Sequence, residues 1–189
     1  MNRDDRTILV GNGATAIDAD LGKVIDSFGT VVRFSWFWVK GFEEKVGTRT
    51  DVWATTVADE TRLRENDFRR IISHSWEWDP KKDKNFKKIA ETFPSVEKTT
   101  REVIDEMTSF AGLAERYAFS TGAIVAWILL REVEEVTLHG FDWARGSDRD
   151  RHHYGDGQSI GKLHKPKKEK VFFDKLIEEG KIVFLKEGP

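Results

Sequence analysis

The sequence predicts an α/β fold with a largely parallel sheet, and three observations support this prediction. Short apolar segments alternate along the chain with segments of helical pattern, which is the order of βαβ units. The 189 residues lie within the usual size of one domain, and no repeat or interdomain linker divides them. Apolar residues make up 39% of the chain, so a disordered chain is excluded. We therefore expect a single domain over residues 1–189.

The first half of the chain predicts four strands separated by helices and loops. The expected strands are apolar or β-branched runs: Thr7–Val10, Thr30–Phe37, Asp51–Thr56 and Arg70–Ser73. Between them, Asp18–Ser27 and Ala58–Asn66 have helical patterns. Two polar stretches, Gly41–Thr50 and Pro80–Asn85, are predicted to be loops.

The second half predicts longer helices and two further strands. Apolar residues share one face at a period of about 3.6 residues in a helix expected from Ser95 to about Tyr117. Ser120-Thr121-Gly122 opens an apolar helix that runs to about Val133. The remaining expected elements are a strand Glu135–His139 ending at Gly140, a polar loop Asp142–Pro166, a helix Lys167–Glu179 with Gly180 as its C-cap, and a strand Lys181–Leu185.

Composition excludes several classes of protein. A net charge of −2 provides no global attraction to nucleic acid or anionic lipid. The apolar run Ala123–Leu130 is too short for a membrane span, and Met1–Arg6 lacks the apolar core of a signal peptide. With no cysteine, disulfides and thiolate catalysis are excluded, and a reducing compartment is indicated. We expect a cytoplasmic enzyme or binding domain.

Two segments have the positions that ligand sites take in such a fold. Gly11-Asn12-Gly13 follows the first strand, and Ser120-Thr121-Gly122 opens an apolar helix. Parallel sheets bind ligands at the carboxyl ends of their strands, and helix N-termini favour phosphate. Each segment also has a purely structural interpretation, since Gly-Asn-Gly is an ordinary turn and Ser is an ordinary N-cap.

The order of four motifs resembles the eukaryotic-type sialyltransferases, glycosyltransferase family 29. The large sialyl motif is matched by Val10–Gly13, Gly22–Phe28, Val31–Phe34 and Gly41–Asp51. The small motif is matched by Ser120–Gly122 and Glu135–Asp142. His152-His153-Tyr154 resembles the third motif, and His164 with Glu169 resembles the His-x4-Glu of the very small motif.

The resemblance implies a Rossmann-like three-layer sandwich, a variant of the nucleotide-sugar glycosyltransferase fold. It implies an inverting transfer of a sugar from a CMP-activated donor to a hydroxyl of a glycan or other acceptor. The CMP-sugar is then the donor substrate, and neither a cofactor nor a metal is expected. His164 would be the general base, with Glu169 orienting or polarising it, and His153 would donate to the donor phosphate. The expected substrate-binding residues are Gly11, Asn12, Gly13, Arg33, Ser35, Ser120, Thr121, Gly122 and Tyr154.

The chain departs from the family in several ways: it is much shorter than typical members, and the gap between His153 and His164 is compressed. The family commonly has Asn two residues after the arginine that Arg33 matches, where this chain has Ser35. Its cysteines, which join the large and small motifs in secreted members, are absent. Two alternatives stay open. One is a transferase with another nucleotide-sugar donor or a nucleic-acid-base acceptor, and the other is a nucleotide-binding protein with a degenerate site.

Other patterns each allow a structural and a functional interpretation. Asp18-Ala19-Asp20 matches a manganese-binding Asp-x-Asp, but a solvated helix start is favoured. The lysine run Lys162–Lys170 could attract a phosphate backbone, although an exposed face is the default interpretation. His74 and His139 are expected to be structural. The tryptophan pairs at 36 and 38 and at 76 and 78 are expected either to pack in the core or to stack on a sugar or base.

Overall fold

A computed structural model describes residues 5–75, 79–114, 118–142, 152–155 and 166–186, without the side chains of residues 65 and 166–168. The described residues form a seven-stranded sheet in the order β5-β4-β3-β2-β1-β6-β7. All neighbouring strands are parallel, which confirms the predicted fold class. The strands are β1 Thr7–Val10, β2 Thr30–Phe34, β3 Val52–Thr55, β4 Arg70–Ser73, β5 Glu97–Lys98, β6 Val136–His139 and β7 Ile182–Phe184.

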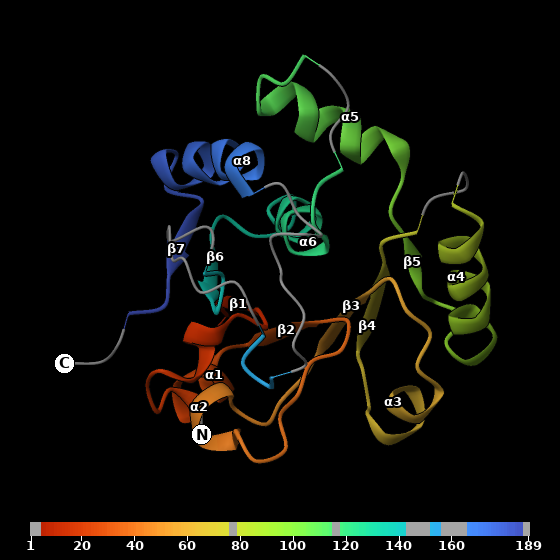
Figure 1. Cartoon of the computed structure of the whole chain (residues 1–189), viewed down its shortest axis with the longest axis vertical. Coiled ribbons are helices and arrows are strands. Elements are labelled where there is room, and N and C mark those ends of the chain that lie inside the picture. The colour runs from red at the N-terminus through yellow and green to blue at the C-terminus, as the bar shows by residue number, and fades with distance from the viewer. Residues whose placement is uncertain (1–4, 76–78, 115–117, 143–151, 156–165, 187–189) are drawn as a thin grey trace.

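Helices cover both faces of the sheet (Figure 1). On one face, α5, α6 and α8 pack over a core that includes Leu9 and Val32. On the other face, α1 and α2 cover Ile8 and Val31, and α3 and α4 cover Trp53. The helical elements are η1 Ala14–Ile17, α1 Gly22–Ser27, α2 Glu43–Val46, α3 Glu60–Glu65, α4 Pro80–Thr92, α5 Arg101–Phe110, α6 Thr121–Leu129 and α8 Pro166–Glu178. Burial on both faces explains why the central strands are continuous apolar runs.

The prediction of a loop over Pro80–Asn85 is wrong. These residues form the first half of α4. Asp79 is the N-cap, its side chain accepting hydrogen bonds from the backbone N–H groups of Lys81 and Lys82, and Pro80 stands in the first turn. A proline is tolerated there because its missing N–H has no partner within the helix in any case.

Several predicted boundaries also move. The strand expected to reach Phe37 ends at Phe34, because Ser35 has a φ of 43° and leaves the extended conformation. The long helix expected from Ser95 is divided into β5 and α5, and α5 ends before Gly112, whose φ is 68°. The expected loop Gly41–Thr50 contains α2, and the helix expected from Asp18 begins only at Gly22. Most of the expected loop Asp142–Pro166 lies outside the described residues.

Gly180 ends α8 as predicted, with a φ of 69°. In the described part of the chain, no helix has the length and apolar character needed to cross a membrane.

Candidate functional site

The turns that follow β1 and β6 interlock at the place where the strand order reverses. The Gly11 N–H donates to the His139 carbonyl (2.7 Å), and the Gly13 N–H donates to the Gly140 carbonyl (3.0 Å). A Cβ atom at Gly11 would lie 2.5 Å from the Gly140 oxygen, so this close approach requires glycine. In doubly wound sheets, ligands bind beyond the carboxyl ends of the strands at such a reversal.

Asn12 links this turn to two other segments. Its side-chain Nδ2 donates to the carbonyl of Phe34 at the end of β2 (3.1 Å). Its own carbonyl accepts from the backbone N–H of His153 (2.9 Å), next to an isolated bridge between Gly13 and His152. The structure thus joins the first and third motifs, which lie about 140 residues apart in the sequence.

The ring of His153 is held between two backbone carbonyls. Its Nδ1 lies 3.2 Å from the Asn12 oxygen and its Nε2 lies 3.1 Å from the Trp38 oxygen. Burial lowers the pKa of His153, and the nearby Arg33 and His152 lower it further, against the opposing effect of the two carbonyls. Tyr154 packs edge-on against this imidazole, with ring centroids 5.1 Å apart.

Arg33 is buried in β2, and its guanidinium donates to the carbonyls of Arg49 (Nε, 2.9 Å) and Val46 (Nη2, 2.6 Å). Burial lowers the pKa of Arg33 to about 10, a change that Asp26 partly opposes. The group therefore remains cationic at neutral pH. Both hydrogen bonds are with the Gly41–Asp51 segment of the large motif, which gives Arg33 a structural role beside the site in addition to the binding role expected for it.

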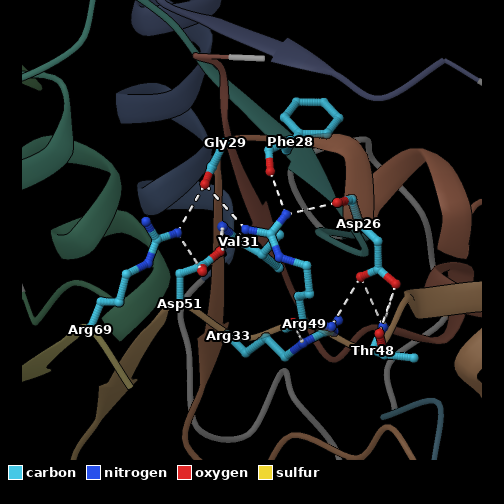
Figure 2. A network of polar contacts seen from close by, with 9 residues as sticks. All are labelled: Asp26, Phe28, Gly29, Val31, Arg33, Thr48, Arg49, Asp51 and Arg69. Carbon is cyan, nitrogen blue, oxygen red and sulfur yellow. Dashed lines mark hydrogen bonds and ion pairs between the residues drawn. The ribbon is translucent and has the colours of Figure 1, made fainter. Parts of the chain in front are cut away.

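A polar clamp holds that loop, as Figure 2 shows. The Asp26 carboxylate accepts from the backbone N–H groups of Thr48 and Arg49. The Arg49 guanidinium donates to the carbonyls of Asp26 (2.7 Å) and Phe28 (2.6 Å) and to the Asp51 carboxylate (2.7 Å). Asp51 also accepts from the Val31 N–H and from Arg69. These residues of the large motif thus build the frame around Arg33.

The N-terminus of α6 forms the second half of the site. Ser120 is its N-cap, as predicted, with its Oγ accepting from the Ala123 N–H (3.2 Å). The Oγ1 of Thr121 lies 3.2 Å from Nδ1 of His74, which directly follows β4. A Cβ atom at Gly122 would lie 2.7 Å from the Phe141 ring, so the helix start packs closely on the turn after β6.

Glu169 in α8 binds the N-terminus of α6. Its Oε1 accepts from the Ser120 N–H (2.6 Å), whereas its buried Oε2 has no partner among the described residues. Burial raises the pKa of Glu169 to about 7, although the bonds with Ser120 oppose the change. The His-x4-Glu motif predicts that Glu169 acts on His164, and it does not predict this contact with Ser120. A signal was present, because Phe172, Phe173 and Leu176 place Glu169 on the buried face of the helix.

Aromatic packing joins the two halves. The rings of Phe34, at the end of β2, and Phe141, after β6, meet edge to face with centroids 5.7 Å apart. Since Phe141 also contacts Gly122, the start of α6 lies at the same sheet edge as the β1 and β2 ends. The structure therefore brings together the described candidates from all four motifs. His164, the expected base, lies outside the described residues.

The remaining candidates are resolved in different ways. His139 is structural as predicted, its Nε2 lying 2.9 Å from the carbonyl of Ala16. Asp20 pairs with Lys45 (2.5 Å), and no three potential metal ligands gather among the described residues. Trp36 and Trp38 are each 51% exposed, so a core position is wrong for this pair. Trp76, Trp78 and the lysine run up to Lys165 lie outside the described residues.

The parallel sheet, its reversal beside β1 and the helix start at the same edge define the class: a Rossmann-like α/β sandwich.

Comparisons with known proteins agree with this class. The sequence model of "Glycosyltransferase family 29 (sialyltransferase)" matches residues 2–74. The match to a crystal structure of a mammalian sialyltransferase covers 97% of this chain and 70% of the chain in that structure, with a TM-score of 0.66 at 21% sequence identity. The match to the structure of the sialyltransferase CstII from Campylobacter jejuni covers 96% of this chain and 80% of the CstII chain, with a TM-score of 0.56 at 12% sequence identity.

Curated relatives extend the match over the chain. Lactosylceramide alpha-2,3-sialyltransferase from Rattus norvegicus is 26% identical over 97% of this chain, which spans 57% of the relative's length. A Homo sapiens CMP-N-acetylneuraminate-beta-1,4-galactoside alpha-2,3-sialyltransferase is 44% identical over 50 residues, 26% of this chain and 13% of that protein. In sequence and in fold, the chain is thus similar to members of glycosyltransferase family 29, the sialyltransferases.

Proposed function

We propose that this chain is an inverting, sialyltransferase-like glycosyltransferase that moves a sugar from a CMP-activated donor to an acceptor hydroxyl. One observation carries the proposal: the four motif segments are joined in pairs by hydrogen bonds. Asn12 of the first motif binds His153 of the third (2.9 Å), and Ser120 of the second binds Glu169 of the fourth (2.6 Å). Such pairing is expected of segments that act on one ligand.

The proposed reaction is a direct displacement. The acceptor oxygen forms a bond to the anomeric carbon of the donor sugar as the bond from that carbon to the CMP phosphate oxygen breaks. The acceptor proton passes to a base, for which the family resemblance proposes His164, and CMP leaves with the bonding electrons. Charge develops on the leaving phosphate, so donors aimed at it stabilise the transition state. The backbone N–H groups of Thr121 and Gly122 in the first turn of α6 are such donors, because the helix itself does not use them. Those of Ser120 and Ala123 already donate to Glu169 and to the Ser120 Oγ.

His153 is the second proposed donor, and its surroundings set a condition on this role. A neutral imidazole carries one N–H, whereas both ring nitrogens of His153 face carbonyl oxygens. Donation to a phosphate therefore requires the ring to leave Asn12 or Trp38. A bound phosphate favours the imidazolium, which opposes the effects of burial and of the nearby Arg33 on the pKa of His153.

The first test is a thermal-shift series with CMP, CDP, UDP, GDP and TDP, with and without manganese. We expect CMP alone to stabilise the chain without a metal requirement, by about 2.7 kcal/mol at one hundred times its Kd. CMP-sialic acid should then be hydrolysed slowly without acceptor and consumed faster with lactose. His164→Ala should abolish transfer and leave CMP binding intact.

Other outcomes of this series separate the alternatives. CMP binding without any turnover would support the nucleotide-binding protein with a degenerate site. A response that requires a nucleoside diphosphate and manganese would contradict the CMP donor and direct attention to Asp18 and Asp20. A chain that responds to none of these nucleotides contradicts the proposal.

A further inference from the structure

Two tryptophans next to the candidate site are exposed to solvent. Trp36 and Trp38 each expose 51% of their surface, while Trp53 is fully buried. Tryptophan is a highly buried residue on average, so a pair of exposed indoles at a functional edge indicates a binding surface.

The loop that carries the two tryptophans is anchored to the core by Phe37. Phe37, between the two tryptophans, is 6% exposed and belongs to the core cluster of Trp53. The guanidinium of Arg62 lies 4.1 Å from the centroid of the Phe37 ring. The indole N–H of Trp38 donates to the Lys40 carbonyl (3.0 Å), which fixes that ring. Because the loop is held on both sides of Phe37, it is already ordered before a ligand binds. Stacking on the indoles therefore costs little conformational entropy of the loop.

The same loop is attached to the proposed donor site. The carbonyl of Trp38 lies 3.1 Å from Nε2 of His153, whose backbone N–H donates to Asn12 (2.9 Å). At the start of the loop, Trp53 Nε1 donates to the Ser35 carbonyl (3.0 Å). The backbone of the loop that carries the exposed indoles therefore contacts His153, one of the residues proposed to hold the CMP phosphate.

We propose that Trp36 and Trp38 form a stacking platform for a pyranose ring of the acceptor glycan. The inference rests on the proposed function and names the acceptor side of the same site. One face of a hexopyranose such as galactose carries mainly C–H bonds, whose positive ends are attracted to the negative face of an indole. The charges nearby favour a neutral ligand, because residues 40–45 carry two lysines and two glutamates. A polyanion such as nucleic acid would find no net positive charge on this segment.

The test compares the wild type with a Trp36→Ala/Trp38→Ala double variant and a Trp36→Phe/Trp38→Phe double variant. Val183→Ala is the matched control, since Val183 is an exposed apolar residue on β7, outside the four motifs. Lactose is the acceptor probe, with CMP-sialic acid as donor, and CMP affinity is measured for every variant. Saturation-transfer NMR of lactose in the presence of CMP reports ring contact without turnover.

In the alanine variant we expect the KM for lactose to rise about tenfold, with CMP affinity and donor hydrolysis unchanged. The saturation-transfer signal of lactose should disappear. The phenylalanine variant should retain most of both properties, and Val183→Ala should match the wild type.

Equal KM values and equal lactose signals in the wild type and the alanine variant would overturn the proposed stacking platform. A wild type that binds CMP and gives no lactose signal would also overturn it. If the alanine variant instead loses binding of a labelled oligonucleotide, the surface serves bases and the sugar inference is wrong. Failure of the wild type both to bind CMP and to use CMP-sialic acid would overturn the proposed function itself.

Discussion

The carboxyl group of Glu169 accepts a hydrogen bond from the backbone N–H of Ser120, 49 residues earlier in the chain (2.6 Å). This bond fastens α8 to the N-cap of α6, the helix start that we propose to face the CMP phosphate. It also holds a carboxyl group where water cannot reach it, with one oxygen lacking a partner among the described residues. The bond thus orders the start of α6. Because the Glu169 carboxyl group is buried there, its ionisation is unfavourable.

Glu169 should make the stability of the chain fall with rising pH. Its pKa is raised to about 7 in the folded state, so between pH 4.5 and 7 the folded chain binds the proton more tightly than the unfolded chain. The free energy of unfolding therefore declines across this window, by up to about 3 kcal/mol. Glu169→Gln keeps the acceptor for Ser120 and removes the charge. We expect the variant to be more stable than the wild type at pH 8 and equal to it at pH 4. Urea unfolding at the two pH values measures the difference, and an equal difference at both contradicts the assignment.

Ser35 should tolerate asparagine and resist a β-branched side chain. Its φ of 43° lies in the left-handed region, which asparagine enters readily and valine does not. We expect Ser35→Asn to leave the free energy of unfolding within about 0.5 kcal/mol of the wild type, and Ser35→Val to lower it by about 1–3 kcal/mol. Chemical denaturation gives both values. A stable Ser35→Val chain would show that the loop relaxes to another conformation.

Asp51 should be essential to the clamp that holds the large-motif loop. Burial opposes its ionisation, but bonds from the Val31 N–H, Arg69 and Arg49 together lower its pKa. Its contribution to stability is therefore present at neutral pH and is lost as the pH falls through that lowered pKa. Asp51→Asn leaves Arg49 facing a neutral group, and we expect a loss of about 3 kcal/mol.

Arg69→Ala is the matched control for the clamp. Its side chain is 58% exposed, and an exposed ion pair contributes about 1 kcal/mol or less. Thermal unfolding of the two variants at pH 7 compares them. Equal losses would show that the buried bonds of Asp51 are not the ones that hold the loop.

The pKa of His153 should respond to the phosphate of CMP. In the free chain, burial and the neighbouring Arg33 and His152 lower its pKa below 6.5. The ring is therefore neutral at pH 7, and its protonation on acidification destabilises the folded state. We expect CMP to raise this pKa and cytidine, which lacks the phosphate, to leave it unchanged. Titration of the imidazole by NMR follows the change, with His139→Phe used to assign the signals. Equal effects of CMP and cytidine would remove His153 from the phosphate site.

The local chemistry of the sequence was sufficient to predict six of the seven strands of the described sheet, all except β5, and their parallel arrangement. Thr7–Val10 and Val136–His139 are short apolar runs stopped by glycine, and the Ser120 cap opens a plainly apolar helix. The polar stretch Pro80–Asn85 predicted a loop, although Asp79-Pro80 is a helix start and these residues belong to α4. Local signals of this kind act over a few residues, and they can therefore be recognised without the fold.

Tertiary structure alone decided how the site is held together. The bonds between Asn12 and His153 and between Ser120 and Glu169 join residues 141 and 49 positions apart, which no periodicity records. The same is true of the exposure of Trp36 and Trp38, since a spacing of two residues gives a shared face but does not say whether that face is buried. Burial and long-range hydrogen bonds depend on what the rest of the chain places nearby. For that reason the sequence determined the elements and their motifs, and the folded chain determined their partners.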